Sequence, residues 1–221
     1  MQAITPYPAE YFTDHAYGLD QQRAEMYIQE RRRLLAYKQE GAILDVGCGT
    51  GDFLAGFGDQ FRKFGIEPSR YAAGIAYSKG IEIIQDIPAL GVKSADMVIY
   101  RCTIQHIDEP FASIRAAISA LKPDGLLVFL ATPNAESLCY RMFGTLPALD
   151  PPHNFWIPGA REMTNVLQNF GAQVIRIEYP YLGTPYASPG RDMLRFIGRL
   201  FGKRSKFPFP KNMMEVYAVR G

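Results

Sequence analysis

The residues with the clearest chemical potential lie in a glycine-rich stretch near the start of the chain. Residues 43–54 read Ile-Leu-Asp-Val-Gly-Cys-Gly-Thr-Gly-Asp-Phe-Leu, so three glycines alternate with other residues after a short apolar run. Glycine lets the backbone turn tightly and lets a ligand approach without interference from a Cβ atom. Glu67 follows 20 residues after Gly47, where a carboxylate can accept hydrogen bonds from both hydroxyls of a ribose. The pattern predicts a site for a cofactor that contains a nucleoside.

The spacing of the glycines separates two classes of cofactor. A dinucleotide fingerprint reads G-x-G-x-x-G and places a pyrophosphate at a helix N-terminus. This chain reads G-x-G-x-G, with Asp45 two residues before the first glycine and Asp52 directly after the last. Carboxylates at these positions would repel a pyrophosphate and would suit a cofactor with a sulfonium and an ammonium. An NAD(P)-dependent oxidoreductase is the alternative, which Glu67 fits and the glycine spacing does not.

Residues 42–131 resemble the class I S-adenosylmethionine-dependent methyltransferases, whose motif I matches the glycine-rich stretch. The turn and strand Leu-Lys-Pro-Asp-Gly-Leu-Leu at 121–127 is a second feature of that family. The resemblance implies S-adenosylmethionine as the cofactor. It implies that Asp45 supports the loop that receives the cofactor's ammonium, and that the backbone of Gly47, Cys48 and Gly49 holds the methionine part.

The resemblance also assigns the nucleoside end of the cofactor. Glu67 is expected to bind the ribose, and Asp86 with the amide of Ile87 to read the adenine. The remaining residues expected at the cofactor are Gly51, Pro68 and Arg101. No metal ligand is expected. A non-catalytic cofactor-binding module with the same fold is a further alternative, because an intact motif does not prove turnover.

The acceptor side rests on residues after the fourth strand and in a proline-rich insert. His106 lies six residues past Tyr100, where the loop should face the transferred methyl. Two roles are open for this histidine. It acts on a hydroxyl acceptor, as general base or as positioning group, or it packs the loop. His153, Trp156 and Tyr11 are the expected substrate contacts, although Trp156 could equally anchor the insert.

A second resemblance concerns the kind of acceptor. Thr-Pro-Asn-Ala-Glu-Ser at 132–137, Phe-Gly at 143–144 and Asp-Pro-Pro-His at 150–153 are similar to small-molecule methyltransferases of the ubiquinone-biosynthesis-like group. This resemblance implies a small-molecule acceptor, such as a sugar, a phenol or a quinone, that is methylated at oxygen.

The elements that must position these residues follow from alternating apolar strands and helices. Strands are expected at 42–46, 64–67, 80–85, 95–100 and 125–131, and helices at 20–40, from 52, and at 109–120. Such βαβ units favour a parallel sheet that is covered on both faces. After a helix at 159–170, strands at 173–179 and 214–220 should pair antiparallel. The fold class is therefore α/β, a Rossmann-like seven-stranded mostly parallel sheet with helices on both faces and an antiparallel last pair.

Length and composition predict one domain over residues 1–221, with three elaborations. These are an N-terminal helical cap at 1–40, a lid or pocket insert at 133–158 and a basic connection at 180–212. Residues 190–211 carry seven basic residues and one acid. This segment is either a solvated helix or a surface for an anionic ligand or lipid headgroups.

Charge and cysteine usage exclude other classes. With 24 Lys and Arg against 22 Asp and Glu, the net charge is too small to indicate a nucleic-acid-binding protein. The three cysteines are odd in number and widely spaced, so neither a disulfide framework nor a CxxC metal site is expected. A signal peptide is not expected at the N-terminus either. The expected setting is cytoplasmic, with no nucleic-acid partner.

Overall fold

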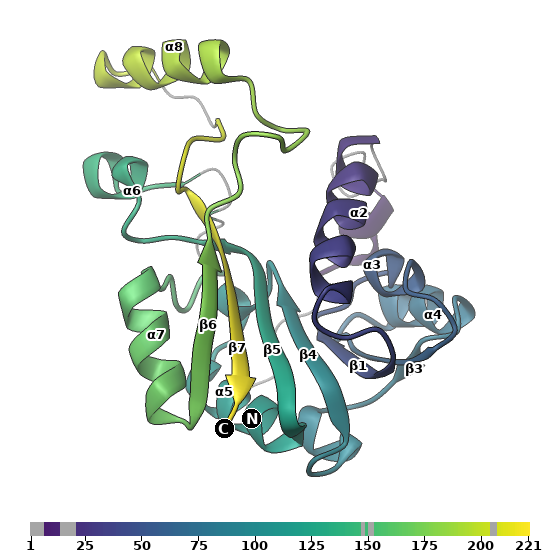
Figure 1. The fold of residues 1–221 in the computed structure, drawn as a ribbon. Coiled ribbons are helices and arrows are strands. Elements are labelled where there is room, and N and C mark those ends of the chain that lie inside the picture. The colour runs from purple at the N-terminus through teal and green to yellow at the C-terminus, as the bar shows by residue number, and fades with distance from the viewer. Residues whose placement is uncertain (1–6, 14–20, 147–148, 150–152, 204–206) are drawn as a thin grey trace.

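Apolar strands form the centre of a seven-stranded sheet (Figure 1). In this computed structural model, which describes residues 7–13, 21–146, 149, 153–203 and 207–221, the strand order is β3-β2-β1-β4-β5-β7-β6. The strands are β1 (Gly41–Val46), β2 (Phe61–Ile66), β3 (Glu82–Ile83), β4 (Ala95–Arg101), β5 (Leu121–Pro133), β6 (Ala172–Glu178) and β7 (Met213–Arg220). β7 pairs antiparallel with both β5 and β6, and the other pairs are parallel. The predicted fold class is confirmed.

Three strands differ from the prediction by more than one residue at an end. β2 begins at Phe61, because its first residue pairs with Gly41 of β1, and Glu67 lies just beyond its end. β3 is only two residues long and forms one edge of the sheet, where the predicted strand spanned 80–85. β5 already begins at Leu121, which pairs with Ala95 before the register shifts.

Helices cover both faces of the sheet. α5 (Pro110–Ala120) and α7 (Ala160–Asn169) bury Ile114 and Met163 in the core on one face. On the other face, α2 (Gln21–Leu35), α3 (Asp52–Ala55) and α4 (Arg70–Ser78) form a second core that includes the fully buried Leu34 and Leu54. Three shorter elements lie between or before these helices: α1 (Ala9–Thr13) and the 3₁₀ turns η1 (Ile87–Leu90) and η2 (Ile104–His106).

The predicted insert and the predicted basic connection pack against each other beyond the carboxyl ends of the parallel strands (Figure 1). The insert contains α6 (Leu138–Phe143), and the connection contains α8 (Pro189–Leu200). Cys139 and Leu146 from the insert share a small core with Phe207, while Phe196 of α8 packs at its edge. Residues 147–148, 150–152 and 204–206 of these segments, and 1–6 and 14–20 of the predicted cap, lie outside the described residues. Among the described helices, none is long and apolar enough to cross a bilayer.

Candidate active site

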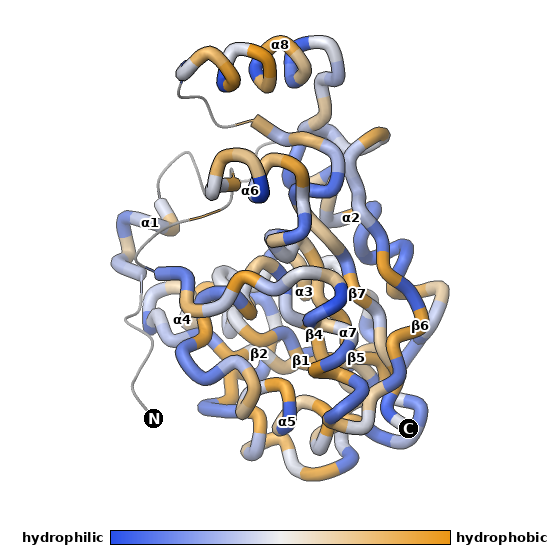
Figure 2. Tube along the Cα trace, turned by 90° about the vertical axis from the view of Figure 1, so that its left-hand side faces the viewer, coloured by the Kyte–Doolittle hydropathy of each residue, from blue (hydrophilic) through white to orange (hydrophobic). Residues whose placement is uncertain are grey.

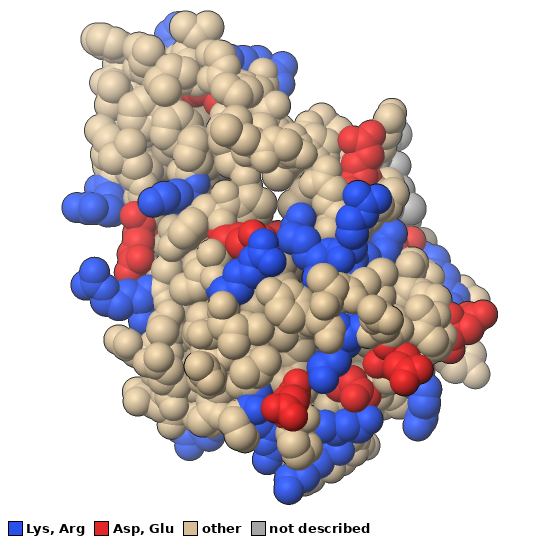
Figure 3. All heavy atoms as spheres, in the orientation of Figure 1, with Lys and Arg blue, Asp and Glu red and all other residues tan. Residues whose placement is uncertain are grey.

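A cavity of about 780 Å³ lies at the carboxyl ends of β1 and β4. This volume is within the range of about 300–1,000 Å³ that is usual for small-molecule sites. Its walls come from α1 and α2, the loops after β1, β2 and β4, and the connection between β6 and β7. Figure 3 shows lysine and arginine side chains gathered beside the hollow between the two upper parts of the molecule. The lining includes Tyr7, Tyr11, Arg23, Tyr27, Glu30, Asp45, Gly47, Cys48, Gly49, Glu67, Pro68, Arg101, Cys102, Thr103, His106, Tyr181, Tyr186, Arg191 and Asn212.

The three glycines of the loop after β1 all have left-handed backbone conformations, but two of them line the cavity and the third packs against the core. Gly47 (φ +80°) and Gly49 (φ +56°) line the cavity. Gly51 (φ +77°) precedes α3 and packs so closely against Ile81 and Ala76 that a Cβ atom would collide with them. The structure therefore brings Gly47 and Gly49 to the site, and Gly51 serves the packing of α3.

Glu67 connects the loops that follow β1 and β2. Its two carboxylate oxygens accept hydrogen bonds from the backbone N–H of Gly49 (2.9 Å) and of Ser69 (2.8 Å). Burial raises the pKa of Glu67, and these two backbone donors oppose that shift. The side chain lines the cavity together with Pro68, so it holds the loop in shape at the place where the ribose was predicted.

Asp45 is a buried carboxyl on the cavity wall, with 2% of its surface exposed. Its Oδ1 atom has no hydrogen-bond partner among the described residues. Burial raises its pKa to about 7, the nearby charge of Arg101 lowers it, and Glu67 and Glu30 raise it further. An oxygen without a partner at this position can accept a hydrogen bond from a cationic ligand.

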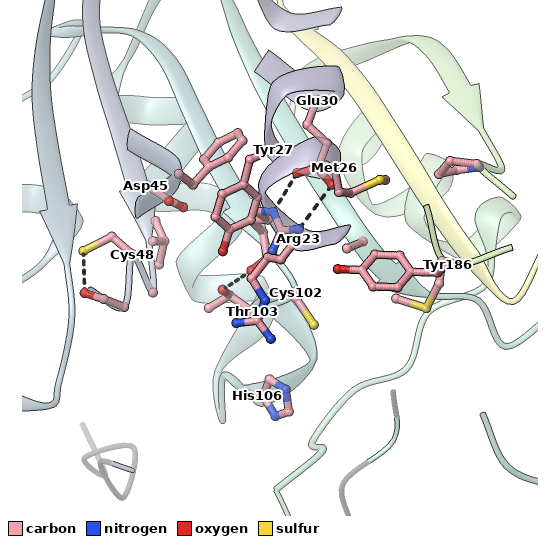
Figure 4. Close-up of a pocket in the computed structure, with 18 of the residues that line it drawn as sticks. Arg23, Met26, Tyr27, Glu30, Asp45, Cys48, Cys102, Thr103, His106 and Tyr186 are labelled. Atoms are coloured by element: carbon pink, nitrogen blue, oxygen red, sulfur yellow. Dashed lines mark hydrogen bonds and ion pairs between the residues drawn. The ribbon is translucent and has the colours of Figure 1, made fainter. Parts of the chain in front are cut away.

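Arg101 is held in the wall by residues from α2 that were not predicted. Its Nε lies 2.7 Å from Oε2 of Glu30, which is fully buried, and its guanidinium lies 4.3 Å from the ring centroid of Tyr27 (Figure 4). A signal for Glu30 was present in the sequence. Met26, Glu30 and Leu34 are spaced by four and share the buried side of α2, so an acid interrupts an otherwise apolar stripe.

His106 ends η2 and reaches the cavity from below the other labelled residues in Figure 4. Its Nδ1 lies 2.8 Å from the carbonyl oxygen of His153. A carbonyl can only accept, so Nδ1 donates in this contact, and Nε2 is the ring nitrogen left to accept a proton. The side-chain amide nitrogen of Asn154 also lies 3.5 Å from Nδ1. The backbone N–H of Phe155 donates to the carbonyl of Gln105 (2.8 Å). These hydrogen bonds attach the insert to η2.

Of the three predicted substrate contacts, only Tyr11 lines the cavity. Tyr11 lines the cavity and stacks on Tyr7, with ring centroids 4.2 Å apart. His153 contributes its carbonyl to His106, and its ring lies beside Tyr7 rather than in the lining. Trp156 is outside the cavity, because its indole N–H donates to Glu162 and its ring packs on Phe111. Trp156 anchors the insert, which is the alternative role that the sequence offered.

The side chains of Asp86, Asp52 and Cys48 are engaged by other parts of the protein. Asp86 accepts a hydrogen bond from the N–H of Ala89 and caps η1, and neither it nor Ile87 lines the cavity. Asp52 is paired with Lys79 at 2.5 Å and is not part of the lining, so its charge does not face a cofactor as the sequence argument assumed. The Cys48 thiol points to the carbonyl of its neighbour Gly49 (3.7 Å), and burial raises its pKa.

Comparison with known proteins adds evidence that the geometry alone does not provide. A family model described as a methyltransferase domain matches residues 19–177. The chain belongs to the methyltransferase family. The prediction of a class I S-adenosylmethionine-dependent methyltransferase is confirmed, and so is S-adenosylmethionine as its cofactor. The match favours the methyltransferase over the oxidoreductase alternative.

Relatives and solved structures agree with this assignment. A ubiquinone biosynthesis O-methyltransferase of Xanthomonas axonopodis pv. citri is 32% identical over 111 residues, which are 45% of this chain and 46% of the relative. The chain spans about half the length of the curated relatives it matches.

Two solved structures show the same fold. One is a SAM-dependent methyltransferase from Archaeoglobus fulgidus, with a TM-score of 0.63 and 20% identity over 90% of this chain and 94% of the other. The second is a magnesium protoporphyrin IX methyltransferase from Synechocystis with bound SAH, with a TM-score of 0.60 and 17% identity over 90% and 84% of the two chains.

Proposed function

We propose that this methyltransferase transfers a methyl group to a hydroxyl oxygen of a small-molecule acceptor, with His106 as the general base. The observation that carries the proposal is the hydrogen bond from Nδ1 of His106 to the carbonyl of His153, which fixes the tautomer in which Nε2 can accept a proton. The curated relatives are named as O-methyltransferases, which supports methylation at oxygen.

The residues at the β1 and β2 end of the cavity fit the cofactor of the family. Asp45 offers a buried oxygen without a partner to an ammonium, and the left-handed Gly47 and Gly49 give a ligand access to the backbone. Glu67 would hold the ribose, since each of its oxygens accepts only one hydrogen bond from the backbone and can accept another. The bound cofactor would supply a methyl group on a positively charged sulfur.

The acceptor would occupy the other end of the cavity, between η2 and the connection from β6 to β7. There Nε2 of His106 would take the proton of the acceptor hydroxyl as the oxygen attacks. A positioned base of this kind contributes about 10²–10⁴-fold to the rate. The carbonyl of His153 would stabilise the imidazolium that forms, because Nδ1 keeps its donor role in both protonation states.

The test is a screen for methyl transfer from a radiolabelled donor to phenols, sugars and amines. We expect transfer to one class of hydroxyl compound. His106→Ala should then lose about 10²–10⁴-fold in turnover, while His153→Ala, which keeps the backbone carbonyl, should lose less than about tenfold. Labelling of amines alone would contradict O-methylation, and full turnover by His106→Ala would contradict the assignment of the base.

A further inference from the structure

One helix carries an exposed apolar face that the site does not use. Met193, Leu194, Ile197 and Leu200 of α8, with Phe201 directly after it, follow the spacing of one helical face. Their exposed fractions range from 42% for Ile197 to 72% for Leu194 and 82% for Phe201. The helix lies at the edge of the molecule, far from the sheet (Figures 1 and 2).

The opposite side of α8 is firmly attached, so the orientation of this face is fixed by packing. The buried carboxylate of Asp192 accepts hydrogen bonds from the Tyr181 hydroxyl (2.9 Å) and the Ser188 N–H (2.8 Å). The ring of Phe196 stacks on Phe209 with centroids 4.7 Å apart. The five apolar side chains therefore point away from the contacts that hold the helix.

The charges around this face select its partner. Residues 189–203 contain Arg191, Arg195, Arg199 and Lys203 but a single acid, Asp192, whose carboxylate is buried. Arg195 lies 3.7 Å from that carboxylate and Arg199 lies over the ring of Phe143, whereas Arg191 and Lys203 are exposed. A second copy of the chain, docked through the same face, would bring like charges together. An anionic lipid surface accepts both the apolar side chains and the bases.

We infer that α8 is an interfacial helix that docks this methyltransferase on the surface of an anionic membrane. Met193, Leu194, Ile197, Leu200 and Phe201 enter the boundary between headgroups and acyl chains, and the exposed bases Arg191 and Lys203 pair with lipid phosphates. The same segment lines the cavity through Tyr181, Tyr186 and Arg191, so docking holds the rim of the cavity beside the lipid. The inference does not depend on the identity of the acceptor or on methylation at oxygen.

The experiment uses the full chain and sedimentation with phosphatidylcholine vesicles, with and without phosphatidylserine. Wild type should bind the mixed vesicles, with a contribution of about fivefold in partitioning for each base near the surface. The variant Leu194→Ser/Ile197→Ser/Phe201→Ser should lose at least about tenfold. Lys203→Glu should weaken binding only to vesicles that contain phosphatidylserine.

A matched control separates the helix from exposed apolar surface in general. Tyr77 (72% exposed) and Val92 (68% exposed) lie in other parts of the chain, and Tyr77→Ser/Val92→Ser should bind vesicles as wild type does. Both multiple variants should keep wild-type affinity for S-adenosylhomocysteine, which shows that they are folded.

Three results would overturn the inference. They are no binding of wild type to mixed vesicles, equal loss in the control variant, and a wild-type dimer that the α8 variant converts to monomer without any vesicle binding.

Discussion

Replacing Asp45 by asparagine should stabilise the protein and weaken its cofactor site at the same time. The asparagine side chain is almost the same size as that of aspartate, but it carries no charge that must be buried. In the ligand-free protein the ionised carboxylate is disfavoured, because it lies in the wall away from water and close to Glu67 and Glu30. A bound ammonium would reverse this, since it would give the carboxylate its missing partner.

The magnitude follows from the pKa of Asp45, which is raised from 3.8 to about 7. Each pKa unit corresponds to about 1.4 kcal/mol, so ionisation of the folded protein is disfavoured by up to about 4 kcal/mol. Because the folded pKa lies above the unfolded value, the folded state binds more protons between about pH 4 and pH 7. The contribution of Asp45 to the free energy of unfolding therefore falls as the pH rises through this range. Above about pH 7 this contribution no longer changes with pH.

Urea unfolding at several pH values measures the difference between wild type and Asp45→Asn. We expect the variant to be more stable by up to about 4 kcal/mol at pH 8, and the advantage to disappear toward pH 4. In calorimetry, the variant should bind S-adenosylhomocysteine about ten- to a hundredfold more weakly, the value of one charge-assisted hydrogen bond. The binding enthalpies measured in two buffers of different ionisation enthalpy give the number of protons released. At pH 6, wild type should release close to one proton when S-adenosylhomocysteine binds.

Two results would refute this reasoning. A stability difference that does not change with pH would mean that Asp45 is not titrating in this range. Binding at pH 6 without proton release would mean that the ligand does not require the ionised carboxylate.

Three further predictions test other parts of the site and its support. His106→Ala should lower kcat at saturating acceptor by about 10²–10⁴-fold while leaving the affinity for S-adenosylhomocysteine within about twofold, because the proposed role of this side chain lies at the acceptor end; unchanged kcat would exclude it as the base. Glu30→Ala should lower the free energy of unfolding by about 3–5 kcal/mol, since it leaves the Arg101 guanidinium buried without its partner, and Glu30→Ala/Arg101→Met should recover a large part of that loss in urea unfolding. Gly51→Ala should destabilise the fold, because its φ of +77° and the contact with Ile81 leave no room for a Cβ, whereas Gly74→Ala, in the open interior of α4, should add about 0.5–1 kcal/mol in the same assay.

The central strands were predictable because burial on both faces leaves a continuous apolar run in the sequence. Strands β1, β4 and β5 were found in this way, and the antiparallel last pair followed from the break in alternation after Ala131. Edge strands lack such a run. β3 was therefore predicted too long, since Glu82 and Ile83 alone pair with β2.

Contacts between distant parts of the chain were not predictable from local patterns. The ion pair of Glu30 with Arg101 spans 71 positions, and only the acid in the apolar stripe of α2 pointed to it. Asp52 shows the reverse error. It was interpreted as a ligand-facing charge because of its place after Gly51, but Lys79 of the following segment approaches from 27 positions away and pairs with it.

The charges of the cavity are divided between its two ends, and this division bears on the direction of the reaction. Among the described lining residues, the acids are Glu30, Asp45 and Glu67, and all three lie at the end formed by α2 and the loops after β1 and β2. Two bases, Arg23 and Arg101, also line that end, and Arg101 is paired with Glu30. The three acids still outnumber the two bases and favour a cationic ligand. The other end carries His106 and Arg191 and, among the described lining residues, no acid, which suits an acceptor whose oxygen becomes negative as it loses its proton. We therefore expect the methyl group to move from the acidic end of the cavity toward His106.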